Sequence, residues 1–229
     1  MSKKESVKIT SSKTLTEKPV KNRKKKEYTQ ALPYKIYNGN LNTKLTKPKE
    51  DYIIAAIDPA FKNCAVRIEG KNSLTVFQQK YSFSKNKETE VCYNNIIEVF
   101  TGLKEKLSTA DFILIESQHH KNKDMLKIGQ TILTVLLMLF SSKQNNNPPL
   151  IIEVEAKIKS NCKYMGEEDG VKGKIKKPEL KKWAVTKGLE ILKRNSDHTT
   201  VEIISKEKKK DDHCDVILYT YCWRRYFCC

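Results

Sequence analysis

The feature that most constrains the fold is a run of three apolar segments joined by tight turns, at residues 52–58, 63–69 and 73–83. "YIIAAID" has the length and continuity of a buried strand, and "NCAVRIE" and "SLTVFQQKYSF" are rich in β-branched and aromatic residues. The turns "PAFK" and "EGKN" are short, and short connections join antiparallel neighbours. This stretch therefore predicts an antiparallel meander of three strands.

After the meander, strands alternate with helices. Residues 88–107 carry apolar side chains near helical spacing, and residues 111–117 and 148–156 are short apolar strands. Residues 123–140 form a helix that is apolar on nearly every side, so it lies in the core or in a subunit interface. Residues 178–194 begin with proline and end with Lys and Arg, which are signals of a helix start and end.

The chain ends with a short expected strand, residues 200–205, and a helix from Asp212 onward. The whole order predicts an α/β domain with a mixed five-stranded sheet, antiparallel meander first, flanked by helices. That order matches the ribonuclease H-like fold.

The first 48 residues have a different composition from the rest. They are rich in Lys, Thr and Ser, contain "KNRKKKE" and show no sustained apolar period, which is typical of a disordered arm. We therefore expect a basic arm over residues 1–48 and a folded domain over 49–229. The net charge of +17 favours a polyanionic partner, with nucleic acid first and an anionic membrane surface second.

Neither a membrane span nor a secretory signal is expected. The apolar run "TILTVLLMLF" is shorter than the roughly 20 residues that a span requires, and the start "MSKKESVKIT" has no hydrophobic centre. We expect a soluble intracellular protein.

Seven cysteines without a CxxC pair do not indicate a disulfide framework. Near the end of the chain lie His213, Cys214, Cys222, Cys228 and Cys229. We expect these cysteines to be buried or idle thiols, and a zinc site is the alternative.

Four carboxylates fall where elements begin or end. Asp58 ends the first expected strand and Glu116 ends the fourth, while Asp212 and Asp215 share one face of the last helix. Open α/β sheets bind ligands at strand ends, so the four side chains are expected to converge on one metal site. Each has a simpler interpretation as a turn starter or helix cap. For these interpretations to hold together, all four acids would have to fall by chance at the positions, in chain order, that a metal site requires.

Three motifs carry a family resemblance over about residues 52–222. "IIAAIDPAFKNCAVRIE" resembles the first motif of the RuvC-type Holliday junction resolvases, and its "DPAFKN" with Ala65 and Arg67 is most similar to those of poxviruses and related large DNA viruses. "ILIESQ" is similar to the family's second acidic strand, and "KKKDDHCD" to its terminal DDxxD motif. Ala60 departs from the family, because many relatives have glycine there.

The resemblance implies a metal-dependent endonuclease that cuts four-way DNA junctions by two-metal hydrolysis. Asp58 would bridge two Mg²⁺ ions, for which Mn²⁺ can substitute, Glu116 would bind one ion, and Asp212 with Asp215 would complete the other. Asp212 is preferred over Asp211 because it keeps the family's spacing of three. The catalytic lysine is expected in the basic loop before the penultimate helix, and Lys177 is favoured over Lys172, Lys174 and Lys176.

Lysines around the acidic positions are expected to bind DNA phosphates with little sequence preference. This group consists of Lys62, Lys172, Lys174, Lys176, Lys208, Lys209 and Lys210.

Branched DNA is the implied substrate, and a symmetric junction calls for a homodimer. The apolar helix around residues 125–140 is the candidate for part of the dimer interface, with burial inside the monomer as the equal alternative. A viral protein would act in the host cytoplasm, where viral DNA replicates.

Other functions stay open at this point: a nuclease for RNA–DNA hybrids or flaps, a non-catalytic DNA-binding module, and attachment to a membrane surface through the arm.

Overall fold

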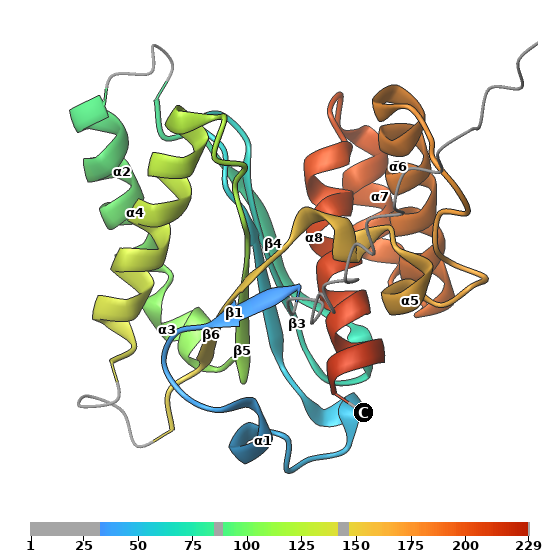
Figure 1. Cartoon of the computed structure of the whole chain (residues 1–229), viewed down its shortest axis with the longest axis horizontal. Helices are drawn as coiled ribbons and strands as arrows, with labels where there is room; N and C mark the ends of the chain where they lie inside the picture. The colour runs from blue at the N-terminus through green and yellow to red at the C-terminus, as the bar shows by residue number, and fades with distance from the viewer. Residues whose placement is uncertain (1–32, 85–88, 142–146, 229) are drawn as a thin grey trace, which may run out of the picture. The chain divides into compact units, whose positions relative to one another are not determined.

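A computed structural model describes residues 33–84, 89–141 and 147–228 of the chain (Figure 1). Within this part the centre is a six-stranded sheet with the order β1-β6-β5-β2-β3-β4. The strands are β1 (Tyr34–Ile36), β2 (Ile54–Asp58), β3 (Cys64–Glu69), β4 (Thr75–Tyr81), β5 (Phe112–Glu116) and β6 (Leu150–Val154).

The pairing confirms the five expected strands and their meander. The strands β2, β3 and β4 are antiparallel neighbours, whereas β2, β5 and β6 run parallel. Residues of β2 alternate between the two faces: Ala55 and Ile57 belong to one apolar core, and Ile54 and Ala56 belong to the other. The strands β2, β3 and β5 are almost fully buried, as their nearly continuous apolar sequences predict, whereas the edge strand β4 is partly exposed.

Helices cover the sheet on both faces (Figure 1). One layer holds α2 (Thr89–Gly102) and α4 (Lys123–Leu139), and α8 (Asp211–Cys222) packs on the opposite face, with α6 (Lys177–Arg194) against it. The shorter helices and turns are α1 (Leu41–Lys44), α3 (Lys104–Ser108), α5 (Cys162–Met165), α7 (His198–Lys206), the 3₁₀ turns Lys49–Asp51, Lys71–Ser73 and Ala156–Lys159, and the π-helical turn Trp223–Phe227. None of the helices described is long and apolar enough to cross a membrane.

The sheet begins earlier than the domain boundary expected at residue 48. Strand β1 pairs antiparallel with β6 and adds a sixth strand to the five predicted. Tyr34 explains why so short a strand is held, because its ring packs edge-on against Trp223 and Phe227 at centroid distances of 5.4 and 5.0 Å. Tyr37 also contacts the domain, because its hydroxyl donates a hydrogen bond to Glu153 Oε2 at 2.7 Å. Residues 1–32 of the expected arm lie outside the described residues.

The expected strand over residues 200–205 is wrong, because this segment lies in helix α7. Asp197 starts the helix by accepting a hydrogen bond from the Thr200 backbone at 3.2 Å. Ile204 is buried in the apolar cluster that also contains residues of α6 and α8, while Ile203 is 56% exposed. Packing of this segment against α6 and α8 stabilises it as a helix.

A buried charge network ties the end of α8 to the sheet. The Glu69 carboxylate accepts hydrogen bonds from Arg224 Nε at 2.9 Å, Thr220 Oγ1 at 2.6 Å and Arg67 Nη2 at 3.2 Å. Arg224 also donates to three backbone carbonyls next to β2 and β3. Because removing one member would leave a buried charge unpaired, this network fixes the orientation of α8.

Candidate metal centre

The first two acids of the site lie side by side at one edge of the sheet. The strands β2 and β5 are parallel neighbours, with Ile57 opposite Ile115. Asp58 and Glu116 follow these residues as the last residues of the two strands. The carboxyl ends of adjacent parallel strands meet at one edge, which is where this architecture presents ligand-binding groups.

The third acid comes from α8. Asp215 lies one residue before Val216 and four before Tyr219, both of which are buried against the sheet. This packing directs Asp215 toward the strand ends. Asp58, Glu116 and Asp215 each offer a carboxylate oxygen, and these three oxygens all lie within 4.8 Å of one another. We call these three residues the acidic triad.

A lysine reaches the triad from the loop after β6. Lys159 ends the 3₁₀ turn Ala156–Lys159, and its Nζ lies 2.6 Å from Asp215 Oδ2 and 3.2 Å from Glu116 Oε2. Its side chain is 13% exposed. The sequence patterns did not single out Lys159, and Lys177 was the favoured candidate for the catalytic lysine. The signal that could have found Lys159 is topological: β6 is parallel to β5, so the residues that follow β6 return to the same sheet edge.

Tyr219 is a second contact that the sequence did not reveal. Its buried hydroxyl donates a hydrogen bond to Glu116 Oε2 at 2.6 Å. The Lys159 ammonium lies over the Tyr219 ring, 5.0 Å from its centroid. Burial, together with the nearby negative charge of Glu116, raises the pKa of the Tyr219 hydroxyl well above its usual value. The hydroxyl is therefore protonated and acts as a donor.

The electrostatics of the triad favour a bound cation. Burial and the charge of Glu116 raise the pKa of Asp58 well above its usual value, against the opposing effect of Lys159. Burial also raises the pKa of Asp215. Burial alone would lower the pKa of Lys159, but Glu116 and Asp215 outweigh it and raise this pKa. Three crowded carboxylates thus repel one another and are stabilised by positive charge.

The donor set fits a hard divalent ion. Carboxylate oxygens are the ligands that Mg²⁺ and Mn²⁺ prefer in proteins, and the triad brings three of them from separate elements to one point. The ammonium of Lys159 already contacts carboxylate oxygens of two of these residues, Glu116 and Asp215. The position is therefore one where a cation is favourable.

The other predicted site residues lie around this centre. Asp212 is at the start of α8, where Lys209 Nζ lies 2.8 Å from its Oδ2, and it is outside the triad. Asp211 pairs with Lys181 at 2.5 Å. Lys177 is exposed at the first residue of α6. Among the residues that the structure describes, the lysine in contact with the triad is Lys159.

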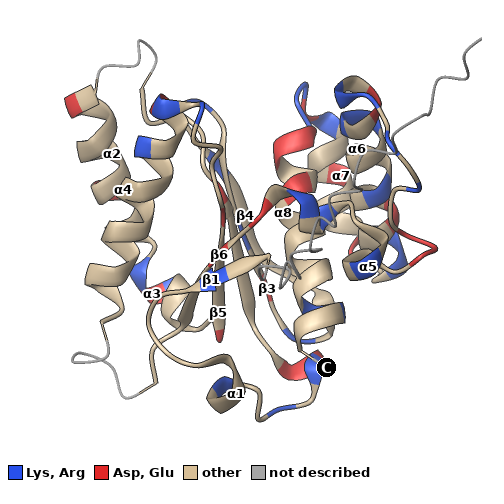
Figure 2. Ribbon diagram, in the orientation of Figure 1, with Lys and Arg blue, Asp and Glu red and all other residues tan. Residues whose placement is uncertain are grey.

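Figure 2 shows Lys and Arg gathered around α6 and the loops beside it, and most of the expected DNA-binding lysines are exposed. Lys210 is half-buried and the others are exposed: Lys62, Lys172, Lys174, Lys176, Lys208 and Lys209. Lys208, Lys209 and Lys210 line a groove beside the start of α8 together with Lys181 and Lys182, which the sequence interpretation had not singled out. A positively charged groove therefore begins next to Asp211, four residues before the third acid of the triad.

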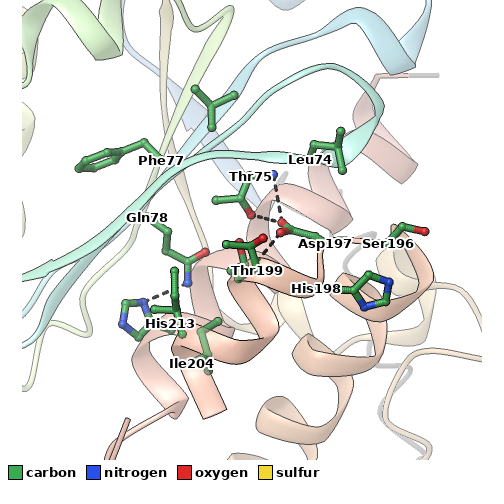
Figure 3. A pocket seen from close by; sticks show the side chains of 13 residues that line it. Leu74, Thr75, Phe77, Gln78, Ser196, Asp197, His198, Thr199, Ile204 and His213 are labelled. Carbon is green, nitrogen blue, oxygen red and sulfur yellow. Dashed lines mark hydrogen bonds between the residues drawn. The ribbon is translucent and has the colours of Figure 1, made fainter. Parts of the chain in front are cut away.

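A separate pocket lies between β4 and α7 (Figure 3). Its volume is about 490 Å³, and no member of the triad lines it. Several of its polar groups make structural hydrogen bonds: Asp197 caps α7 and accepts from Thr75, and His213 Nδ1 is 3.0 Å from Gln78 Nε2 (Figure 3). Burial lowers the pKa of His213 to about 4, so this histidine is neutral. The pocket is accordingly not part of the acidic centre.

The cysteine and histidine cluster at the chain end is dispersed over different contacts. His213 contacts Gln78, Cys214 lies 3.8 Å from the Val185 carbonyl, and Cys222 donates to the Ile158 carbonyl at 3.2 Å. Cys229 lies outside the described residues. Within the part of the chain that the structure describes, the acidic triad is the group of His, Cys, Asp and Glu side chains with metal-binding spacing.

Comparison with known proteins identifies the fold. No protein-family profile and no curated protein matches the sequence. Among solved structures, the yeast mitochondrial Holliday junction resolvase Ydc2 is similar with a TM-score of 0.57 at 14% identity, over 82% of this chain and 86% of that one. Thermus thermophilus RuvC aligns over 76% of this chain and 95% of that one, with TM-scores of 0.46 alone (13% identity) and 0.47 with a Holliday junction substrate (9% identity). Together with the sheet order, the likeness to Ydc2 confirms the ribonuclease H-like fold, with six strands in place of five.

Proposed function

We propose that this protein is a metal-dependent endonuclease that resolves four-way DNA junctions by paired, symmetric nicks. The observation that carries the proposal is the acidic triad at the carboxyl ends of β2 and β5, with the third acid supplied by α8. Likeness of fold to a Holliday junction resolvase supports the choice of substrate. Fold alone does not fix a substrate, so the substrate needs its own test.

The acidic residues would hold the metal ions. In our proposal Asp58, Glu116 and Asp215 bind Mg²⁺, with Mn²⁺ as the substitute, and Asp212 joins them as a ligand of a second ion. When bound, such ions supply an activated water and offset the charge that develops on the phosphate. The repulsion among the carboxylates explains why the protein would bind the ions at this point and not elsewhere along the sheet edge.

Lys159 takes the role that the sequence interpretation gave to Lys177. Among the described residues, its ammonium is the positive group in contact with the triad, within 3.2 Å of two of its carboxylates. A phosphate bound at the triad would lie within reach of this ammonium, which would stabilise the negative charge of the transition state. Tyr219 beneath it limits the directions in which the lysine side chain can turn.

The basic surface would hold the DNA arms. Lys62 is exposed on the turn that follows Asp58, and the groove of Lys181, Lys182, Lys208, Lys209 and Lys210 lies beside α8. Phosphates bound there would place a duplex arm next to the triad. Binding through phosphates is weakly dependent on sequence and falls steeply as the salt concentration rises.

Paired nicks require two active sites, and α4 is our candidate for part of the dimer interface. An apolar groove of about 390 Å³ lies between α2 and α4, lined in part by Ile97, Val135, Met138 and Leu139. Met138 is 70% exposed and Ile97 is 49% exposed. We propose that a second copy of this chain covers the groove about a twofold axis, since an isologous contact would relate two triads by the symmetry of a four-way junction.

The motifs "DPAFKN" and "KKKDDHCD" add a biological setting to the proposal. Their resemblance to resolvases of large DNA viruses suggests a role in viral DNA recombination or concatemer processing in the host cytoplasm.

A panel of labelled substrates tests this function. The purified protein is incubated with Mg²⁺ and a four-way junction, a linear duplex, a flap or an RNA–DNA hybrid, and the products are mapped on denaturing gels. We expect symmetric cuts in the junction and little cutting of the linear duplex. Preferential cutting of the hybrid or flap would leave the metal centre in place but overturn the substrate. Binding without metal-dependent cutting of any substrate would show a non-catalytic DNA-binding module.

A further inference from the structure

The contact between Tyr219 and Glu116 has geometry that core packing does not require. Tyr219 is 1% exposed, and it lies on α8 one helical turn after Asp215. Its hydroxyl donates to Glu116 Oε2 at 2.6 Å, and the same oxygen is 3.2 Å from Lys159 Nζ. A short hydrogen bond to an ionised acceptor is among the stronger ones in proteins. One residue of α8 is therefore bonded directly to the acid that ends β5.

The aromatic ring of Tyr219 makes a separate contact. Lys159 Nζ is 5.0 Å from the ring centroid and bonds to Asp215 at 2.6 Å. The hydroxyl and the ring thus act on different partners: the hydroxyl contacts the carboxylate and the ring faces the ammonium. A substitution that removes only the hydroxyl separates these two contacts, because phenylalanine retains the ring.

We propose that Tyr219 is a positioning residue of the acidic centre, whose hydroxyl fixes the Glu116 carboxylate beside Asp58 and Asp215 so that the three carboxylates can bind a divalent ion. This proposal rests on the metal-dependent function proposed above and adds a residue outside the ligand set to it. Two rotatable methylene groups carry the carboxyl group of Glu116, and without the hydrogen bond the longer contact to Lys159, at 3.2 Å, would be the remaining restraint described on Oε2. Groups that orient metal ligands commonly contribute 10- to 100-fold to metal affinity.

The test measures Mn²⁺ binding to the full chain without DNA by isothermal titration calorimetry, together with the thermal unfolding temperature in EDTA. Tyr219→Phe is expected to weaken Mn²⁺ binding roughly 10-fold or more while the unfolding temperature stays within a few degrees of wild type. Tyr221→Phe is the matched control on the same helix. Its hydroxyl bonds to Asp169 at 2.5 Å and not to the triad, so its Mn²⁺ affinity should equal that of wild type.

Two further measurements separate positioning from general destabilisation. Added to Glu116→Gln, Tyr219→Phe should cause little further loss of Mn²⁺ affinity, because the carboxylate that it orients is already gone. In nicking assays, a high Mn²⁺ concentration should restore most of the rate of Tyr219→Phe.

The measurements distinguish failure of the metal centre from failure of the positioning role. If wild type binds no Mn²⁺, the proposed metal centre itself is wrong. If wild type binds Mn²⁺ and Tyr219→Phe binds it equally well, the positioning role is overturned while the metal centre stands. Equal losses in Tyr219→Phe and Tyr221→Phe, or a full additional loss in the Glu116→Gln background, would show a structural effect and would also overturn the proposal.

Discussion

Replacing Lys159 with methionine should destabilise the metal-free protein. Three carboxylate oxygens lie within 4.8 Å of one another, and two like charges at that distance repel by ~3.5 kcal/mol at an effective dielectric constant of about 20. Lys159 offsets this repulsion from 2.6 Å away. Removing one partner from a buried ion pair costs roughly 3–5 kcal/mol. Because the Lys159 and Asp215 side chains keep 13% and 21% exposure, we expect the lower end, about 3 kcal/mol at pH 8.

Urea unfolding in EDTA measures this loss, and thermal unfolding should show a decrease of about 6–12 °C. The pH dependence has a definite sign. Asp58 and Asp215 have raised pKa values, so each costs stability as the pH rises above its unfolded pKa, and the missing lysine makes that cost larger. The destabilisation by Lys159→Met should therefore shrink as the pH falls from 8 to 5.

The control is Lys157→Met in the same 3₁₀ turn. Lys157 is 57% exposed and pairs with Glu155 on the surface, so its loss should change the free energy of unfolding by less than about 1 kcal/mol. Equal stability of Lys159→Met and wild type at pH 8, or a destabilisation that grows toward pH 5, would refute the view that Lys159 neutralises the triad.

Three other outcomes follow from the contacts described. Asp169→Asn should cost roughly 2 kcal/mol at pH 7 in urea unfolding. Hydrogen bonding to Arg194 lowers the pKa of Asp169, so this difference should persist down to about pH 4 and shrink only as the pH falls further. A chain that starts at residue 49 lacks β1 and should unfold at a lower temperature than one that starts at residue 33; equal temperatures would mean that β1 is dispensable. Met138→Glu should convert a dimer into monomers in analytical ultracentrifugation, and an unchanged dimer would exclude this groove as the interface.

The sequence predicted the sheet well because its strands have simple patterns. β2 and β5 are continuous apolar runs that end in an acid, so both their position and the location of Asp58 and Glu116 could be predicted. The strand β1 could not, because three residues in a basic segment show no periodicity, and its partners Trp223 and Phe227 are almost 200 residues away in sequence. The strand predicted over residues 200–205 was wrong for a related reason, because the helix that forms there is stabilised by packing on α6 and α8.

In the candidate site, too, the contacts between residues that are distant in sequence could not be predicted. Asp215 was predictable from its spacing on a helix, but the choice among lysines depended on where a loop returns in space. Lys159 is 18 residues from Lys177 in the same basic stretch, and charge composition does not distinguish them. Tyr219 resembles any buried aromatic residue of an apolar helix until its hydroxyl is seen to contact Glu116.

The most direct test of the central claim is nicking of a labelled four-way junction with Mg²⁺ by wild type, Asp215→Asn and Glu98→Gln. Glu98 is an exposed acid on α2 and serves as the control for loss of one carboxylate. We predict paired symmetric nicks with wild type and Glu98→Gln, and junction binding without cutting with Asp215→Asn. Cutting by Asp215→Asn at the wild-type rate, or cutting by wild type that persists in EDTA, would contradict a metal centre built on the acidic triad.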